Sequence, residues 1–121
     1  MNQDYTSKYI NYLTQAIDKS LVEYKDTEDV ETFKELKKEM TYINNIFEKE
    51  QSLANINKKR FNAFIQKLNI LFEKYYISTF DVYGNALKLC YENDIHRKYV
   101  KNLRSKNLKK GAKNKFTLLL W

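Results

Sequence analysis

Apolar residues recur every three or four positions through most of the chain, which is the period of an amphipathic α-helix. The first such run covers residues 5–24, and its inward-facing positions are Thr6, Ile10, Leu13, Ile17, Leu21 and Tyr24. Residues 25–27 interrupt the register. Thr27 is followed by Glu28 and Asp29, which makes it a suitable N-cap with acids at the positive end of a helix dipole. The pattern predicts a second helix that starts at Thr27.

A seven-residue step continues through the middle of the chain. Its apolar positions are Phe33, Met40, Phe47, Ala54, Phe61, Leu68 and Tyr75, with companions at Leu36, Ile43, Phe64 and Leu71. The step weakens only where Glu50 and Asn57 occupy companion positions. A regular heptad register of this kind is typical of helices that pack along one another.

Two architectures are compatible with this heptad register. A single helix of about 50 residues would be roughly 75 Å long, and a coiled-coil homodimer through residues 28–77 would then be needed to bury both aromatic halves. A helical hairpin that turns within residues 51–57 closes by itself. We favour the hairpin because Ser52, Asn55 and Asn57 tolerate turns.

The last third of the chain predicts two further helices. Ser78 can cap a helix over residues 79–92, and Asp94 can cap another that begins at Ile95 and frays near residues 105–107. A helical wheel of the last helix places Ile95, Tyr99, Val100 and Leu103 on one side and Arg97, Lys98, Lys101 and Arg104 on the other. We expect the apolar side to pack and the cationic side to face solvent. A helix-turn-helix over residues 79–105 is a less favoured alternative, because its connection fits that motif loosely.

The composition supports an all-α fold. The chain has no proline and only two glycines, Gly84 and Gly111, so the usual turns of β-proteins are missing. Hydrophobic residues make up 43% and aromatic residues 15%, enough to form a packed core. We predict a small bundle of four to five helices, with residues 1–110 as one domain and residues 111–121 as a short basic and hydrophobic tail.

Positive charge is concentrated at the C-terminal end. Residues 1–95 contain 13 basic and 15 acidic side chains and sum to −2, whereas residues 96–121 contain nine lysines or arginines and no acid, which gives the net charge of +7. The nine are Arg97, Lys98, Lys101, Arg104, Lys106, Lys109, Lys110, Lys113 and Lys115. Lysine and arginine side chains that contact phosphates release condensed counterions, so a dense cationic surface has affinity for nucleic acid.

We therefore expect a non-enzymatic nucleic-acid-binding or regulatory protein, with DNA favoured over RNA, that uses a basic C-terminal helix on a helical scaffold. A second basic run, Lys58, Lys59 and Arg60, joins this surface if the hairpin forms. The alternative is a helical protein-interaction module, such as an immunity or inhibitor protein, that binds an acidic partner. A lysine-rich end can also be a solubilising tail, and docking of residues 116–121 on anionic lipid is disfavoured because the apolar stretch is short.

Catalytic chemistry finds little support in the sequence. His96 is the only histidine, and Cys90 lies on a predicted buried stripe, which favours a core role over a nucleophilic one. We expect no enzyme activity, no metal and no cofactor. The single cysteine and the N-terminal residues, which lack a signal-peptide pattern, predict a cytoplasmic protein. The lysine-, asparagine- and isoleucine-rich composition suggests the A/T-rich genome of a low-GC bacterium, its phages or its plasmids.

Overall fold

The computed structural model describes the backbone of residues 3–78 and 80–109 and, within these, the side chains of residues 5–78 and 82–105. This part of the chain forms four α-helices: α1 (Gln3–Glu23), α2 (Val30–Glu50), α3 (Lys58–Lys74) and α4 (Asn85–Lys109). A π-helical turn, η1 (Phe80–Gly84), leads directly into α4. The predicted all-α bundle is confirmed.

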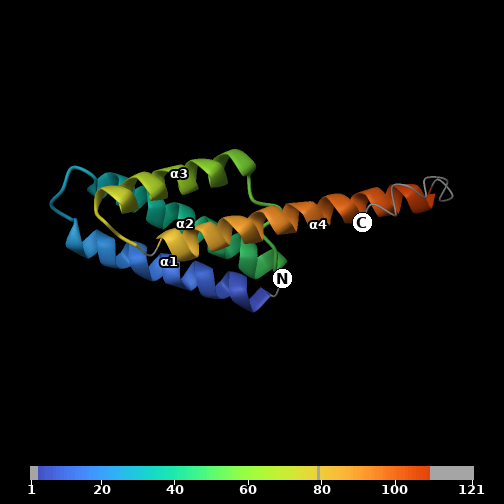
Figure 1. Cartoon of the computed structure of the whole chain (residues 1–121), viewed down its shortest axis with the longest axis horizontal. Coiled ribbons are helices and arrows are strands. Elements are labelled where there is room, and N and C mark those ends of the chain that lie inside the picture. Colours follow the sequence, from blue (N-terminus) through green and yellow to red (C-terminus); the bar gives the residue numbers. More distant parts are fainter. Residues whose placement is uncertain (1–2, 79, 110–121) are drawn as a thin grey trace.

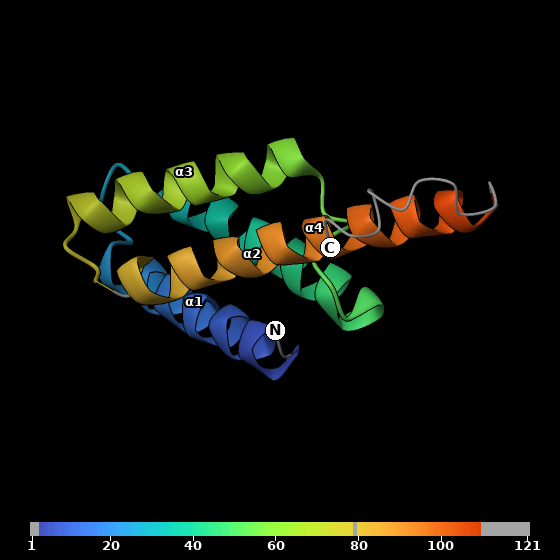
Figure 2. The same cartoon turned by 45° about the vertical axis from the view of Figure 1, so that its right-hand side comes forward.

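Successive helices run in opposite directions through the bundle (Figure 1). Turned by 45°, the same arrangement shows α4 continuing past the ends of α1, α2 and α3 (Figure 2). About half of α4 therefore belongs to the bundle, and the remainder projects from it. This projection places the basic C-terminal helix outside the packed core.

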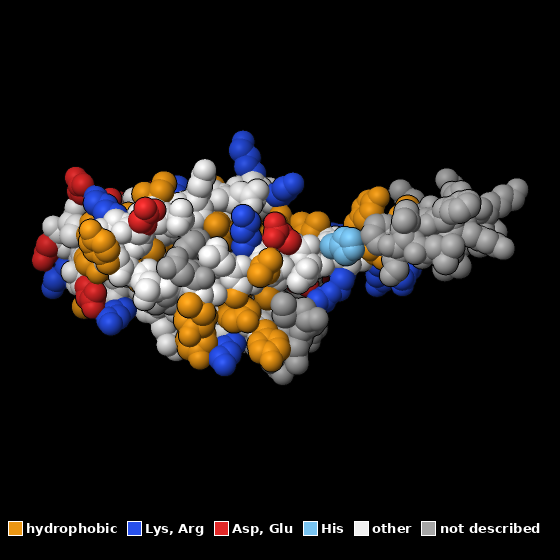
Figure 3. Space-filling view, in the orientation of Figure 1, with side chains coloured by type: hydrophobic (Ala, Val, Ile, Leu, Met, Phe, Trp, Pro, Cys, Tyr) orange, Lys and Arg blue, Asp and Glu red, His pale blue; other side chains and the backbone are white. Residues whose placement is uncertain are grey.

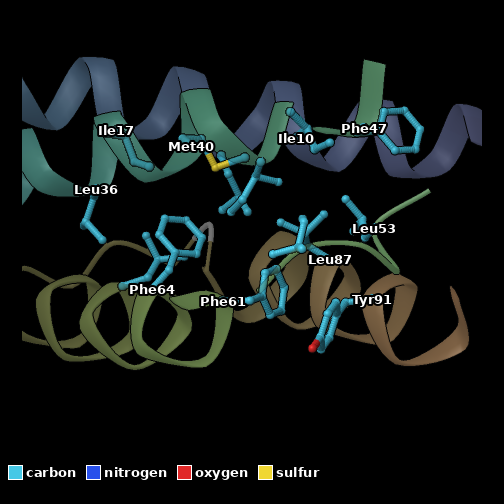
Figure 4. Packing of buried hydrophobic residues seen from close by; sticks show 14 of the residues in the cluster. Ile10, Ile17, Leu36, Met40, Phe47, Leu53, Phe61, Phe64, Leu87 and Tyr91 are labelled. Carbon is cyan, nitrogen blue, oxygen red and sulfur yellow. The ribbon is translucent and has the colours of Figure 1, made fainter. Parts of the chain in front are cut away.

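The core lies between two pairs of helices (Figure 4). Ile10, Ile17, Leu36, Met40 and Phe47 come from α1 and α2 and face Phe61, Phe64, Leu87 and Tyr91 from α3 and α4. All of the predicted heptad and companion positions from Phe33 to Leu71 are buried except Ala54 and the two polar ones. Each large apolar side chain so buried contributes about 1.5–3 kcal/mol before the entropy cost of folding.

Residues 51–57 form the predicted turn of a helical hairpin. Gln51 adopts a left-handed conformation, with φ of 55°, and its N–H donates to the Phe47 carbonyl at 2.7 Å, which ends α2. Leu53 and Ile56 fold inward and are buried. The Asn57 side chain accepts from the Arg60 N–H at 3.0 Å and caps α3. The hairpin is confirmed, and the uninterrupted helix of about 50 residues is wrong.

The predicted start of the second helix is also wrong. Helix α2 begins at Val30, because Thr27 serves the preceding turn instead of a helix N-terminus. The Thr27 hydroxyl donates to the Tyr24 carbonyl at 2.7 Å and accepts from the Asp29 N–H at 3.3 Å. These two bonds close the connection between α1 and α2.

The predicted break at Asp94 is not found, since α4 runs without interruption through Lys109. Asp94 is buried, and its Oδ2 accepts the Leu53 N–H at 2.8 Å. The carboxylate thus satisfies a backbone group of the 51–57 turn instead of capping a new helix. A helix-turn-helix over residues 79–105 is therefore wrong, as is the fraying near residues 105–107. The tail, residues 111–121, lies outside the described residues.

Candidate nucleic-acid interface

The core-facing stripe of α4 changes from buried to exposed residues where the helix leaves the bundle. Inside the bundle this stripe consists of Leu87, Cys90 and Asp94, all buried. Steps of three or four residues continue it to Lys98, Lys101 and Arg104, which are exposed. We call residues 97–109 the α4 extension. Its cations lie on the continuation of the core-facing stripe, just past the end of the bundle.

The 51–57 turn lies beside the first turn of the α4 extension. The Lys98 ammonium donates a hydrogen bond to the Asn55 side-chain oxygen, and Arg97 pairs with Asp94 at 3.5 Å. Neither Lys101 nor Arg104 forms an ion pair with a described side chain. Sequence reasoning missed Asn55, because a lone asparagine in a turn gives no sign of a partner 43 residues away.

The apolar side predicted for the last helix does not pack as expected. Ile95 packs against the core, but Tyr99, one turn further, is 57% exposed. Val100 and Leu103 are half-buried. The physical reason is the length of α4, which runs beyond the helices that could cover it (Figure 2). The α4 extension therefore presents cations on one side and an apolar stripe on another.

Six of the described cations of the bundle form ion pairs with nearby acids. The bundle ion pairs are Lys19–Glu23, Lys34–Glu31, Lys37–Asp18, Arg60–Glu39, Lys67–Glu35, Lys74–Glu28 and Lys74–Asp29. The space-filling view accordingly shows basic and acidic side chains interspersed over the bundle (Figure 3). Exposed pairs of this kind add little stability, but they cancel the field of the cations. The sequence of the α4 extension contains no acid at all.

The residues of the second basic run, Lys58, Lys59 and Arg60, have different surroundings in the structure. Arg60 donates to Glu39 through two nitrogens, at 3.0 and 2.7 Å, and its guanidinium lies 3.7 Å from the centre of the Tyr42 ring. The hydrogen bonds to Glu39 raise the pKa of Arg60. Lys58 instead lines the groove between α3 and α4, and both Lys58 and Lys59 are exposed. Lys58 therefore lies near the first turn of the α4 extension, whereas Arg60 is held by α2.

The remaining predicted site residues are only partly described. Lys106 and Lys109 lie on the backbone of α4, and their side chains are outside the described set. Lys110, Lys113 and Lys115 lie outside the described residues altogether.

Cys90 lies in the core, as its position on the predicted buried stripe indicated. Burial raises the pKa of its thiol, and this effect outweighs a hydrogen bond with Thr6 that lowers it. The thiol is thus protonated near neutral pH. Among the described residues, no three histidine, cysteine or acidic side chains come together as metal ligands. Within the same part of the chain, every helix is too short or too polar to cross a membrane.

Comparison with known proteins finds no match among protein-family models, curated proteins or solved structures.

Proposed function

We propose that this chain is a non-enzymatic nucleic-acid-binding protein whose α4 extension contacts phosphates. The observation that carries the proposal is the row formed by Lys98, Lys101 and Arg104, which continues the core-facing stripe past the bundle within a segment, residues 97–109, that contains no acid. The first half of α4 is packed in the bundle, and this packing fixes the direction of the row. Its phosphate contacts would release counterions and supply affinity that is independent of base sequence.

Duplex DNA is the preferred ligand in this proposal. An α-helix with its side chains is about 10–12 Å across, and the major groove of B-form DNA is about 12 Å wide. The 13 residues from 97 to 109 extend for about 20 Å, enough to follow that groove across several base pairs. The deep, narrow major groove of A-form RNA does not admit a helix in the same way.

The test compares two charge-neutralised variants of the full chain. Lys101→Gln/Arg104→Gln removes two cations of the α4 extension, and Lys38→Gln/Lys49→Gln removes two exposed cations of α2 as a matched control. Binding of labelled duplex DNA is measured by fluorescence anisotropy over a series of salt concentrations. We expect the slope of log K against log salt to become shallower by about two in the first variant, since each lost contact removes about 0.9. The control should keep the slope of the unchanged protein.

Two results would overturn the proposal. One is a full chain that shows no salt-sensitive binding of duplex DNA or RNA. The other is an equal slope for both variants, which would mean that charge acts without regard to position.

One observation favours a protein partner as the second candidate. The exposed ring of Tyr99 lies beside the half-buried Val100 and Leu103, so the α4 extension is a basic amphipathic helix. Such a helix fits an apolar groove with an acidic rim. An acidic partner captured by the full chain, together with the absence of any nucleic-acid binding, would support this candidate.

A further inference from the structure

An open groove of about 840 Å³ lies between α3 and α4. Asn62, Gln66 and Asn69 line it from α3, and Lys88 and Glu92 line it from α4. Ile65, Tyr91 and Ile95 lie between these two walls. Its volume is within the range of ligand sites, and its walls are rich in hydrogen-bonding groups.

The α3 wall is a ladder of uncharged amides. Asn62, Gln66 and Asn69 occupy successive turns of one helix face, so their side chains are about 5–6 Å apart. Each carboxamide offers both donors and an acceptor, which is the combination that pairs with the edges of nucleobases. A face that serves solvation alone would more often carry lysine and glutamate, as the exposed face of α2 does.

Tyr91 supplies a second feature of the groove. Its ring is stacked on Phe61, with centroids 4.3 Å apart, and its hydroxyl points away from the labelled core side chains (Figure 4). The hydroxyl is buried and has no hydrogen-bond partner among the described residues, and burial raises the pKa of the phenol. A polar group in this state calls for a partner, because an unsatisfied buried hydroxyl costs about 1–3 kcal/mol.

Two cations, Lys58 and Lys88, line the groove at different levels. The Lys98–Asn55 contact places the 51–57 turn beside α4. Lys58 directly follows this turn at the start of α3 and therefore lies near Ile95, which lines the same groove. Lys88 precedes Ile95 by two helical turns and thus lies about 10 Å further along. In the other direction the groove-facing stripe of α4 passes from Ile95 to Tyr99, whose ring is exposed.

We propose that the groove between α3 and α4 binds a short single-stranded nucleic-acid segment. Phosphates pair with Lys58 and Lys88, base edges pair with the amide ladder, and a base at the open end stacks on Tyr99. Stacking on an exposed aromatic ring beside a cationic path is the usual chemistry of single-strand binding. This inference rests on the proposed function, because the α4 extension supplies the neighbouring phosphate contacts.

The experiment uses the full chain with a labelled single-stranded DNA of mixed sequence and with the corresponding duplex. Asn62→Ala/Gln66→Ala removes two of the three side-chain amides of the amide ladder. Asn11→Ala/Gln15→Ala is the matched control, since both residues are exposed and have the same four-residue spacing on α1. We expect the groove variant to bind the single strand about tenfold more weakly than the control, at about one kcal/mol or less for each lost hydrogen bond. Tyr99→Ala should lose at least about fivefold through stacking. Duplex binding by the groove variant should stay unchanged.

Failure of the groove site and failure of the α4 extension as an interface give different results. If the groove variant and its control bind the single strand with equal affinity, the proposed groove site is overturned. This holds even if the groove binds an extended peptide. Salt-sensitive duplex binding in the same samples would leave the α4 extension as a nucleic-acid interface. If the unchanged chain binds no nucleic acid, both proposals are overturned. Circular dichroism of each variant verifies that the helices are retained.

Discussion

Asp29 shows how a single side chain fastens two helices. Its Oδ2 accepts the Lys74 ammonium at 2.6 Å and the Tyr75 hydroxyl at 2.6 Å, so the end of α3 is tied to the start of α2. The Tyr75 ring also stacks on Tyr24, with centroids 4.3 Å apart. The hydrogen bond from Lys74, followed by that from Tyr75, lowers the pKa of Asp29.

The lowered pKa of Asp29 makes this link dependent on pH. A carboxyl whose pKa is lower in the folded protein adds stability above its unfolded pKa, and that stability disappears as pH falls through the folded value. We expect Asp29→Asn to reduce the free energy of unfolding at about pH 7, and the difference from the unchanged protein to be smaller at about pH 2. Urea unfolding at both pH values measures it. A difference of the same size at both pH values would contradict this role of the charge.

Residue types predicted the core better than they predicted polar partners. Phe33, Met40 and Leu68 were placed by spacing alone, because a regular apolar register must be buried somewhere in a small bundle. Thr27 and Asp94 were misplaced, since serine, threonine and aspartate serve turns, caps and tertiary contacts equally well. Only the folded chain shows that Asp94 meets the Leu53 N–H, 41 residues away.

At the scale of the elements, α4 is one helix in two environments. Its first half buries Leu87 and Cys90, and its second half carries Lys98 and Lys101 at the equivalent stripe positions. Asp94 lies at the boundary, where it binds the 51–57 turn. The pattern predicted a helix on each side of this boundary but not its continuity, because the Asn93–Asp94 pair is also a common helix end. The amide ladder on α3 escaped notice for a related reason, since uncharged polar residues at helical spacing resemble an ordinary solvated face.

Removing the Asp94 carboxylate should weaken the attachment of the 51–57 turn to α4. We expect Asp94→Ala to lower the free energy of unfolding by about 1–3 kcal/mol, because the buried Leu53 N–H then loses its acceptor. Asp94→Asn keeps an acceptor oxygen and should lose less. Urea unfolding of the three proteins at one pH provides the comparison. If Asp94→Ala is as stable as the unchanged chain, the hydrogen bond is not what holds the turn.

At the scale of the whole molecule, two features favour a monomer. The apolar core is buried within one chain, and positive charge is concentrated at one end of it. Phe33, Phe47 and Phe61 are buried inside the monomer, as are the other heptad positions except Ala54 and Tyr75. A homodimer through residues 28–77 would therefore have to use the exposed face of α2, which is rich in lysine and glutamate, and that of α3, which carries lysines and side-chain amides. Two α4 extensions, each basic and without acids, would repel one another if they were paired.

We accordingly expect the free chain to be monomeric, with a molar mass of 14.6 kDa by light scattering. The mass should stay the same from low to high salt, because the apolar contacts that close the bundle lie within one chain. A mass of twice this value would contradict the expectation, and its salt dependence would locate the cause. A dimer that appears only at high salt would indicate pairing of the α4 extensions through Tyr99, Val100 and Leu103, since salt screens their repulsion. A dimer that persists at low salt would instead indicate an interface on the faces of α2 and α3.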